Sequence, residues 1–254
     1  PLPRMEELDS FSNVKYFTTL DLKSGYWQIG MDNESIEKTA FTCSEGHFEF
    51  KVMPFGLKNA PADFQRLMEL VLHGLNLNIC LVYIDDIIVF SRDFDTHLDR
   101  LNTVFNAIAT ANLKLKPKKC HIMKKQVEFL GHVVSEKGIC PDPNKTKVLE
   151  NFAIPKSVKQ VQKFLGLVNW FRRFIPNLSV IAKPLYDLLH KDCKFEMTEE
   201  RVKSFQILKN CLINPPIIGF PCFDTDAQFI LHTDASNTDI GAVLSQKQGD
   251  KEWI

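Results

Sequence analysis

Residues 81–91 read LVYIDDIIVFS and place two aspartates, Asp85 and Asp86, side by side inside an almost unbroken apolar run. Such a run is typical of a buried strand, where an ionised carboxylate without a partner costs several kcal/mol. Either the chain turns here and lifts the pair into solvent, or something strongly positive lies beside it. The flanking segments ICLVY and IIVFS predict two short strands around a tight turn, with the acids at its tip.

Another acid, Asp21, occupies a comparable position near the end of the β-rich stretch YFTTLDL, residues 16–22. If this strand and those within 80–90 are neighbours in one sheet, three carboxylates meet at one end of it. Like charges that close cannot all stay ionised without a cation, and hard oxygen ligands suit Mg²⁺. Two such ions, about 3.5–4 Å apart, would support an in-line phosphoryl transfer. A solvated β-turn without metal is the competing interpretation.

The composition allows more than one domain and excludes a global basic field. The chain has 254 residues, 44% of them hydrophobic, and its 31 Lys plus Arg balance its 31 Asp plus Glu. Any argument for nucleic-acid binding must therefore be local. The run from Lys114 to Lys125 contains six lysines and no acid, and it indicates either a solvated face or a binding surface.

The seven cysteines are scattered and form no C-x-x-C pair, which favours neither a disulfide framework nor a zinc site and indicates a reducing compartment. No signal peptide is evident, and no apolar stretch approaches the ~20 residues of a membrane span. We therefore expect no membrane partner. A start at Pro1 is what we expect of a piece of a longer chain.

The pattern of elements changes along the chain. The first part mixes strands and helices, with strands over 38–44 and 47–53 around Glu45-Gly46, a helix over 61–75, a helical stripe over 94–108 and a hairpin over 127–139 that turns at 136–138. After about residue 142 the pattern is helical, with starts at Pro143, at the capping box Ser157-x-x-Gln160 before a run to Phe174, and after Thr198. Two strands, 228–236 and 240–246, follow.

Five segments in order carry a resemblance to a known family. LDLKSGYWQI, MPFGLKNAP, YIDDIIVFS and FLGHVVSEKGI resemble the reverse transcriptase of Gypsy-type LTR retrotransposons, and HTDASNTDIGAVLSQ resembles the start of the RNase H domain in their Pol polyproteins. The resemblance implies an α/β (α+β) fold: a right-hand polymerase palm with an antiparallel sheet and backing helices, a helical thumb, a connection and a truncated RNase H-like start. The implied division is 1–140 for partial fingers and palm, 141–222 for thumb and connection, and 223–254 for the RNase H-like fragment.

The same resemblance assigns the acids. Asp21, Asp85 and Asp86 match the catalytic triad of the palm, with Asp21 and Asp85 as the main ligands of two Mg²⁺ or Mn²⁺ ions, the carbonyl of Leu22 assisting, and Asp86 completing the cluster. The implied reaction is RNA- and DNA-templated DNA synthesis, in which the primer 3′-hydroxyl attacks the α-phosphate of a deoxynucleoside triphosphate. Positioning and electrostatics supply most of the catalysis in such transfers.

Three residues match the pocket for the incoming nucleotide. Tyr26 matches the aromatic steric gate that rejects a ribose 2′-hydroxyl, although an ordinary loop aromatic beside Trp27 is the alternative. Phe55 and Gly56 match the part of the pocket under the nucleotide. Gly56 would let backbone approach the substrate closely, and Phe55 would either stack or pack.

Two further motifs are expected to hold the template–primer duplex. Phe129, Leu130, Gly131 and His132 match the primer grip, with a plain surface hairpin as the alternative. The second motif consists of three residues spaced by four on one helical face, Gln162, Gly166 and Trp170. A mid-helix Gly costs roughly 1 kcal/mol relative to Ala, and either a close duplex backbone or helix–helix packing would explain it. The nearby candidates for phosphate contacts are Lys163, Arg172 and Arg173.

The resemblance also implies what this fragment lacks. Asp234 matches the first metal-binding carboxylate of RNase H, and the other acids of that site are expected beyond Ile254, so RNase H endonuclease activity is expected only in the full-length parent. The basic finger residues for the triphosphate are expected upstream of Pro1. Two alternatives to the polymerase follow: a catalytically silent nucleic-acid-binding remnant, and a structural interaction domain without metal. The expected location is cytoplasmic, in the virus-like particle of the element, or unknown, and the sequence leaves the oligomeric state open.

Overall fold

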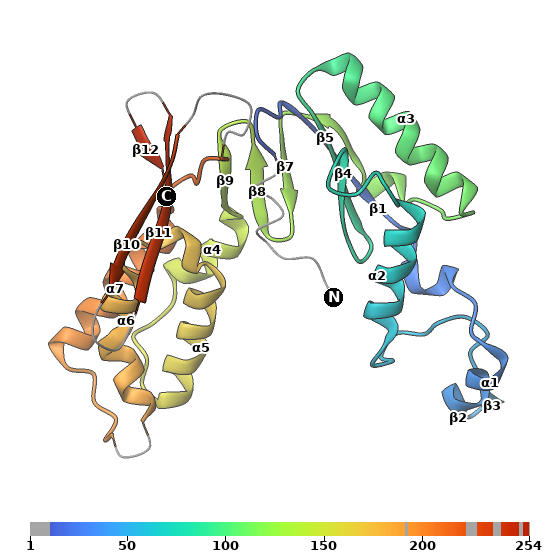
Figure 1. Ribbon diagram of the computed structural model, residues 1–254. Coiled ribbons are helices and arrows are strands. Elements are labelled where there is room, and N and C mark those ends of the chain that lie inside the picture. The colour runs from blue at the N-terminus through green and yellow to red at the C-terminus, as the bar shows by residue number, and fades with distance from the viewer. Residues whose placement is uncertain (1–10, 191–192, 222–227, 236–239, 249–250, 254) are drawn as a thin grey trace. The chain divides into compact units, whose positions relative to one another are not determined.

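The computed structural model describes residues 11–190, 193–221, 228–235, 240–248 and 251–253 (Figure 1). The chain divides into two compact units, residues 1–129 with 220–254, and residues 130–219. Each unit is described by itself. Within the described residues, no helix is both long and apolar enough to cross a bilayer.

The first unit contains a four-stranded antiparallel sheet (Figure 1). Its strand order is β4 (Cys80–Tyr83), β5 (Asp86–Ser91), β1 (Tyr16–Asp21) and β6 (His121–Lys124). The pairing expected between the segments 16–22 and 80–90 is confirmed, because β1 runs beside β5 from Tyr16↔Ser91 to Asp21↔Asp86. The sheet therefore brings two distant acids to the same end.

Two helices complete the core of this unit. α2 (Ala60–Val71) begins with Pro61 in its first turn and packs on β4, and α3 (Phe94–Thr110) packs on β5. Asp93 caps α3 by accepting a hydrogen bond from Thr96 N–H at 2.8 Å. The buried side chains between helices and sheet include Phe64 and Met68 of α2, Val104 and Ile108 of α3, and Leu20, Val82, Ile87 and Val89 of the strands.

The first unit also contains short elements outside the central sheet. They are η2 (Gly25–Gln28), α1 (Asn33–Ile36), η3 (Glu37–Thr39), β2 (Phe41–Cys43), β3 (Gly46–Phe48), η4 (Pro117–Lys119) and β7 (Gln126–Phe129). The hairpin expected around Glu45-Gly46 is confirmed, with Gly46 at a φ of 138°. Its strands are shorter than the predicted 38–44 and 47–53. The first strand starts late because residues 37–39 form a 3-10 turn, and the second ends at Phe48.

The second unit begins with a hairpin and continues with helices. β8 (His132–Ser135) and β9 (Gly138–Pro141) pair antiparallel around Glu136-Lys137, within the predicted hairpin. Turns at Leu130 and Gly131, with φ of 48° and 77°, separate β8 from β7, so the predicted single hairpin over 127–139 contains an additional turn. Left-handed backbone at two successive residues is what a type I′ hairpin turn requires.

The helices of the second unit are α4 (Pro143–Glu150), α5 (Val158–Trp170), η5 (Arg172–Phe174), α6 (Leu178–Tyr186), η6 (Asp187–Leu189) and α7 (Glu199–Ile213). Three of them, α4, α5 and α7, start where the sequence predicts, whereas α6 was not predicted. Asp142, Ser157 and Thr198 cap α4, α5 and α7 through their side-chain oxygens. Two predicted helix ends need correction: α5 ends at Trp170 and is followed by the 3-10 turn η5, and α2 of the first unit ends at Val71, before the left-handed Gly74.

Three strands lie near the C-terminus, β10 (Phe229–Ala235), β11 (Ile240–Gln248) and β12 (Lys251–Trp253). The predicted pairing of β10 with β11 is confirmed, antiparallel from Phe229↔Gln246 to Ala235↔Ile240. The predicted turn between these strands lies outside the described residues. β12 pairs with β11 and was not predicted.

Candidate active site

The paired aspartates stand at the tip of the β4–β5 hairpin. Ile84 and Asp85 form the turn, and Ile84 has a φ of 54°, a left-handed conformation that a β-branched residue rarely adopts. Asp85 is half-buried, and Asp86 is exposed at the start of β5. The turn therefore gives both carboxylates access to solvent.

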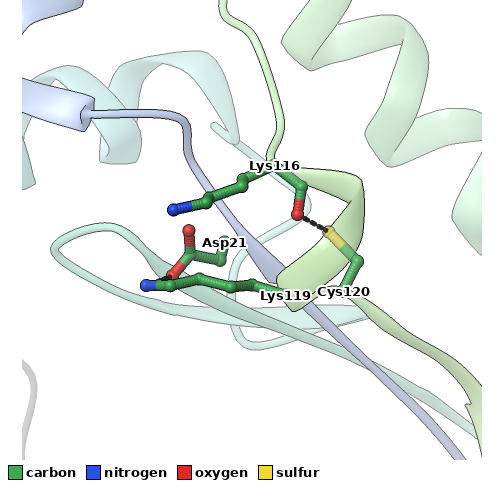
Figure 2. A network of polar contacts seen from close by, with 4 residues as sticks. All are labelled: Asp21, Lys116, Lys119 and Cys120. Carbon is green, nitrogen blue, oxygen red and sulfur yellow. Dashed lines mark hydrogen bonds and ion pairs between the residues drawn. The ribbon is translucent and has the colours of Figure 1, made fainter.

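Positive charge also lies beside the acids. Lys119 Nζ is 2.8 Å from Asp21 Oδ2, and the Asp21 side chain is only 15% exposed. Figure 2 shows the side chains of Lys116 and Lys119 extending toward the Asp21 carboxylate from the segment that follows α3. The structure therefore contains both arrangements considered from the sequence: a turn that exposes Asp85 and Asp86 to solvent, and a cation beside Asp21.

Backbone and side-chain hydrogen bonds tie the loops of Asp21 and Lys119 together. Lys116 N–H donates to Asp21 O at 2.8 Å. The amide of Gln28 donates to Lys114 O at 3.0 Å, and its oxygen accepts from Lys114 N–H at 2.7 Å. These contacts hold the basic segment against the strand end that carries Asp21.

A pocket of about 380 Å³ opens between these loops. Its lining residues are Asp21, Leu22, Ser24, Gly25, Tyr26, Phe55, Asp85, Lys116 and Lys119. Five of them belong to the set predicted from the sequence, namely Asp21, Leu22, Tyr26, Phe55 and Asp85. Two predicted residues lie beside the lining: Asp86 stands opposite Asp21 in the sheet, and Gly56 follows Phe55 with a φ of 93°.

The electrostatics of Asp86 reflect its crowded neighbourhood. Although its surface is exposed, the protein atoms around it displace water from the carboxylate, and the negative charges of Asp85 and Asp21 add to this effect. Together they raise the pKa of Asp86 to about 6, and Lys119 partly opposes the rise. The three acids therefore interact electrostatically. Within the described residues, no three Asp, Glu, His or Cys side chains close into a cluster able to hold a metal ion.

Aromatic rings form one wall of the pocket. The Tyr26 ring packs on Phe55 at 5.4 Å and edge-on against Phe64 at 5.3 Å, measured between ring centroids. Burial raises the pKa of the Tyr26 hydroxyl, and the nearby Asp85 carboxylate raises it further. Phe55 is 64% exposed, so its ring is available to a ligand as well as to Tyr26. Tyr26 is thus a packed pocket residue, whereas its neighbour Trp27 is 51% exposed.

Four pocket residues were not assigned to the pocket from the sequence: Ser24, Gly25, Lys116 and Lys119. The basic run from Lys114 to Lys125 was the available signal for the two lysines. Gly25 had none, because its role comes from packing: a Cβ there would lie 2.8 Å from Phe64 Cζ and 3.5 Å from Asp85 Cβ. A larger residue at this position would require the Phe64 ring or the loop to shift.

The predicted primer-grip residues occupy the boundary between the two units, which runs between Phe129 and Leu130. Phe129 is 5% exposed, and Leu130 and Gly131 form the left-handed turn. His132 is 3% exposed and stacks on Phe174 at 5.6 Å. Burial lowers the pKa of His132. The His132 side chain therefore packs in the interior. Any contact with a ligand at the surface would come from the turn at Leu130 and Gly131.

The predicted face of α5 is open to solvent. Gln162, Gly166 and Trp170 are exposed, with Trp170 at 62%, while the opposite face buries the side chains of Val161, Phe164, Leu165 and Val168. Apart from the adjoining residues and backbone of α5 itself, no described atom lies within 4 Å of a Cβ built on Gly166. Close helix packing therefore does not explain this glycine.

Asp234 lies in β10, opposite Gly241 of β11, and its side chain is exposed. The other described carboxylates do not join it in a metal-binding group of three. The prediction that Asp234 binds a metal stays a prediction.

Family models match two parts of the chain. Residues 1–134 match the model described as reverse transcriptase (RNA-dependent DNA polymerase), and residues 197–254 match the RNase H-like domain found in reverse transcriptase. These matches agree with the order of motifs along the chain.

Curated relatives are polyproteins of transposons. The chain is 47% identical to the retrovirus-related Pol polyprotein from transposon 297 of Drosophila melanogaster, over 97% of this chain and 23% of the relative. It is 45% identical to the Pol polyprotein from transposon opus of the same organism, over 97% of this chain and 26% of the relative, and 38% identical to the Transposon Tf2-3 polyprotein of Schizosaccharomyces pombe, over 100% and 19%. The chain thus spans about a quarter or less of the length of these relatives.

Solved structures share the fold. The foamy viral protease-reverse transcriptase dRH in complex with ds DNA superimposes with a TM-score of 0.83 at 26% identity, over 99% of this chain and 45% of that one. The foamy viral protease-reverse transcriptase in complex with RNA/DNA hybrid gives a TM-score of 0.76 at 26% identity, over 94% and 33%. The expected mixed α/β fold with antiparallel sheets is confirmed.

Proposed function

We propose that this chain, which belongs to the reverse transcriptase (RNA-dependent DNA polymerase) family of retrotransposon Pol polyproteins, catalyses metal-dependent addition of deoxynucleotides to a primer 3′-hydroxyl on an RNA or DNA template. One observation carries the proposal. Asp21 and Asp85, far apart in sequence, line the same pocket, and Asp86 faces Asp21 across the β1–β5 ladder.

The acids suit a pair of divalent cations. The donors are hard carboxylate oxygens, and Leu22 lines the same pocket. Burial raises the pKa of Asp86 and the negative charges of Asp85 and Asp21 raise it further, and a cation would relieve that repulsion. We propose Asp21 and Asp85 as the main ligands of Mg²⁺ or Mn²⁺, with Asp86 completing the cluster. Bound there, two cations would activate the primer hydroxyl and stabilise the charge on the transferred phosphate. Lys119 would then exchange its ion pair with Asp21 for contact with solvent or substrate.

The aromatic wall suits the sugar and base of a nucleotide. Tyr26 is held between Phe55 and Phe64, so its ring cannot easily yield to an additional hydroxyl on the sugar. We propose that it excludes ribonucleotides and that Phe55 and Gly56 lie under the incoming deoxynucleotide. The open space around Gly56 is compatible with a close ligand.

The template–primer duplex is proposed to contact the second unit. The exposed face of Gln162, Gly166 and Trp170 has the shape for a minor groove, since the Gly leaves room for backbone between two longer side chains. The turn at Leu130 and Gly131 would hold the primer end, with Phe129 and His132 supporting it. Phosphate contacts from Lys163, Arg172 and Arg173 would be independent of sequence. The solved relatives named above were bound to ds DNA and to RNA/DNA hybrid, which supports this assignment.

The remaining proposals concern the parts of the chain. Residues 1–140 are proposed as partial fingers and palm, 141–222 as thumb and connection, and 223–254 as the start of an RNase H-like domain. Asp234 would be the first metal ligand of that domain, and RNase H activity is proposed only for the full-length parent. The RNase H-like family match supports an RNase H-like assignment for residues 223–254, although it covers 197–254 and so begins within the segment proposed as thumb and connection.

Primer extension on a primed RNA template tests the function. Asp85→Asn should lower the rate of deoxynucleotide incorporation at least about 100-fold, because several kcal/mol of charge stabilisation would be lost. Asp99→Asn, which changes an exposed acid on α3, is the matched control and should leave the rate unchanged. Tight duplex binding without incorporation would instead support the catalytically silent nucleic-acid-binding remnant. Failure to bind both duplex and Mg²⁺ would support a structural domain.

A further inference from the structure

α2 carries a buried amide beside the turn that bears the acids. Gln65 is 3% exposed. Its Oε1 accepts a hydrogen bond from Ile84 N–H at 2.7 Å, and its amide nitrogen donates to Val82 O at 3.4 Å and to Glu69 Oε1 at 3.0 Å. Since only the oxygen of the amide can accept from Ile84 N–H, the nitrogen must face the other two partners. The amide thus contacts both β4 and the turn that follows it.

Ile84 is the residue that most needs such a partner. Its φ of 54° is strained for a β-branched side chain, and such conformations persist only where the surroundings enforce them. Its side chain is partly buried against the core of the first unit, which fixes one side of the residue. Its N–H would lose its acceptor without Gln65, and an unpaired buried donor is costly.

We propose that Gln65 is a positioning residue, which holds the left-handed turn at Ile84 and thereby fixes where the Asp85 and Asp86 carboxylates stand. The catalytic consequence rests on the proposed function, whereas the effect on the turn does not.

Phe64, the residue before Gln65 in α2, supports the loop that follows Asp21. Phe64 is fully buried, and a Cβ on Gly25 would lie 2.8 Å from its Cζ. Consecutive residues of one helix therefore support the segment that follows Asp21 and the turn that carries Asp85. A helix is a rigid base for this purpose, and a displacement of about 1 Å at a reacting group can cost 100-fold in rate.

The first test replaces the amide without changing its bulk. Gln65→Met keeps an unbranched side chain of similar size, and Glu69→Ala removes the exposed partner while leaving the bond to Ile84. In the 254-residue chain, Gln65→Met should accelerate hydrogen exchange of the Ile84 amide and lower kcat for incorporation about 10- to 100-fold, with the KM for primed template within about twofold. Glu69→Ala should change neither quantity. An unchanged Ile84 exchange rate, or an unchanged kcat, in Gln65→Met overturns the proposal.

A double mutant separates positioning from general destabilisation. Ile84→Gly permits the left-handed conformation without steric cost, so the turn should depend less on Gln65. Gln65→Met should therefore cost at least about threefold less in kcat when Ile84 is Gly, whereas equal costs in both backgrounds contradict the proposal. If Gln65→Met does not fold, Gln65→Asn carries the same expectations, because its amide is one methylene too short to reach Ile84. If the unmodified chain does not extend a primer, the proposed function fails, and the Ile84 exchange rates alone decide whether Gln65 holds the turn.

Discussion

At the scale of single residues, charge decides the character of the site. Asp21 forms an ion pair with Lys119, and Asp85 reaches solvent through the turn. Burial raises the pKa of Asp86, and the charges of Asp85 and Asp21 add to the rise. The segment that supplies Lys119 also supplies the backbone bond from Lys116 to Asp21 O. The pocket therefore balances its own charge and presents acidic and basic groups together.

The first unit also buries a histidine, His97, whose two ring nitrogens both have hydrogen-bond partners. His97 of α3 is 0% exposed, with Thr18 Oγ1 2.8 Å from its Nε2 and Ser91 Oγ 3.0 Å from its Nδ1. Burial lowers the pKa of His97 to about 4, and the positive charge of Arg100 contributes. The neutral ring joins β1, β5 and α3.

His97 makes stability depend on pH. Between pH 6.5 and 4 the unfolded chain binds a proton at His97 and the folded chain does not, so this histidine's contribution falls as the pH falls, by at most about 1.4 kcal/mol per pH unit. His97→Asn should flatten the pH dependence of the free energy of unfolding in this window, measured by urea unfolding. His73→Asn alters an exposed histidine and should retain the wild-type slope. Equal slopes in all three proteins would contradict the burial argument.

At the scale of elements, the β4–β5 hairpin and two helices do different work. The β4–β5 turn presents acids, α2 supports the loops around them, and α5 buries one face and leaves the other open. In each helix, one face packs against the core, and the other face is left to contact a loop or solvent. Glycine is the residue type at which this can be tested with the smallest change.

Gly25→Ala should damage the active-site loop. The added methyl would meet Phe64 Cζ at 2.8 Å, and Phe64 is too well packed to move freely. We expect a loss of about 1–3 kcal/mol in the free energy of unfolding, measured in urea, together with weaker incorporation. Gly30→Ala is the matched control, because no described atom lies within 4 Å of its added Cβ. A neutral Gly25→Ala would show that the loop adjusts without cost.

Gly166→Ala should separate stability from binding. Alanine at this exposed mid-helix position raises the free energy of unfolding by about 0.5–1 kcal/mol, because it restricts the unfolded chain and favours the helix. If a duplex backbone approaches α5 here, the same methyl should weaken binding of a primer–template duplex, measured by fluorescence anisotropy. Higher stability with unchanged duplex affinity would remove Gly166 from the proposed track.

At the scale of the whole molecule, two compact units have separate cores. The acids and their pocket belong to residues 1–129, and the proposed duplex face belongs to residues 130–219. A ligand of the acids should therefore stabilise one unit and leave the other unchanged. Trp27 reports on the first unit and Trp170 on the second.

Mg²⁺ should raise the unfolding midpoint of the first unit alone. Binding at about 100 times the dissociation constant adds about 2.7 kcal/mol to a folded unit that holds the ion. We would follow urea unfolding by tryptophan emission in two variants, Trp170→Phe with Trp253→Phe, and Trp27→Phe with Trp253→Phe. Mg²⁺ should raise the unfolding midpoint only in the variant that keeps Trp27, and Asp85→Asn in that variant should abolish the increase. Equal shifts from both reporters would place the ion elsewhere.

The sequence by itself determined the features that depend on neighbouring residues. Asp142, Ser157 and Thr198 cap helices because their side chains reach backbone two or three residues ahead, and the acids at 85 and 86 stand at a turn because short strands flank them. The sequence also predicted that the segment of Asp21 and the segments around Asp85 are strands, whereas their pairing was a condition that the structure met. The apolar run that follows Ser157 continues to Phe174, but α5 ends at Trp170, so the predicted end of this helix was several residues too late.

Only the tertiary structure decided which side chains meet across the fold. Lys119 and Asp21 are 98 positions apart, and neither residue's neighbours indicate the other. The same holds for Gln65 beneath Ile84, for Gly25 against Phe64 and for the burial of His132, which was predicted to contact the primer. Hydrophobic periodicity specifies which face of an element is buried, whereas its partners depend on the packing of the whole core, because burial itself has no direction.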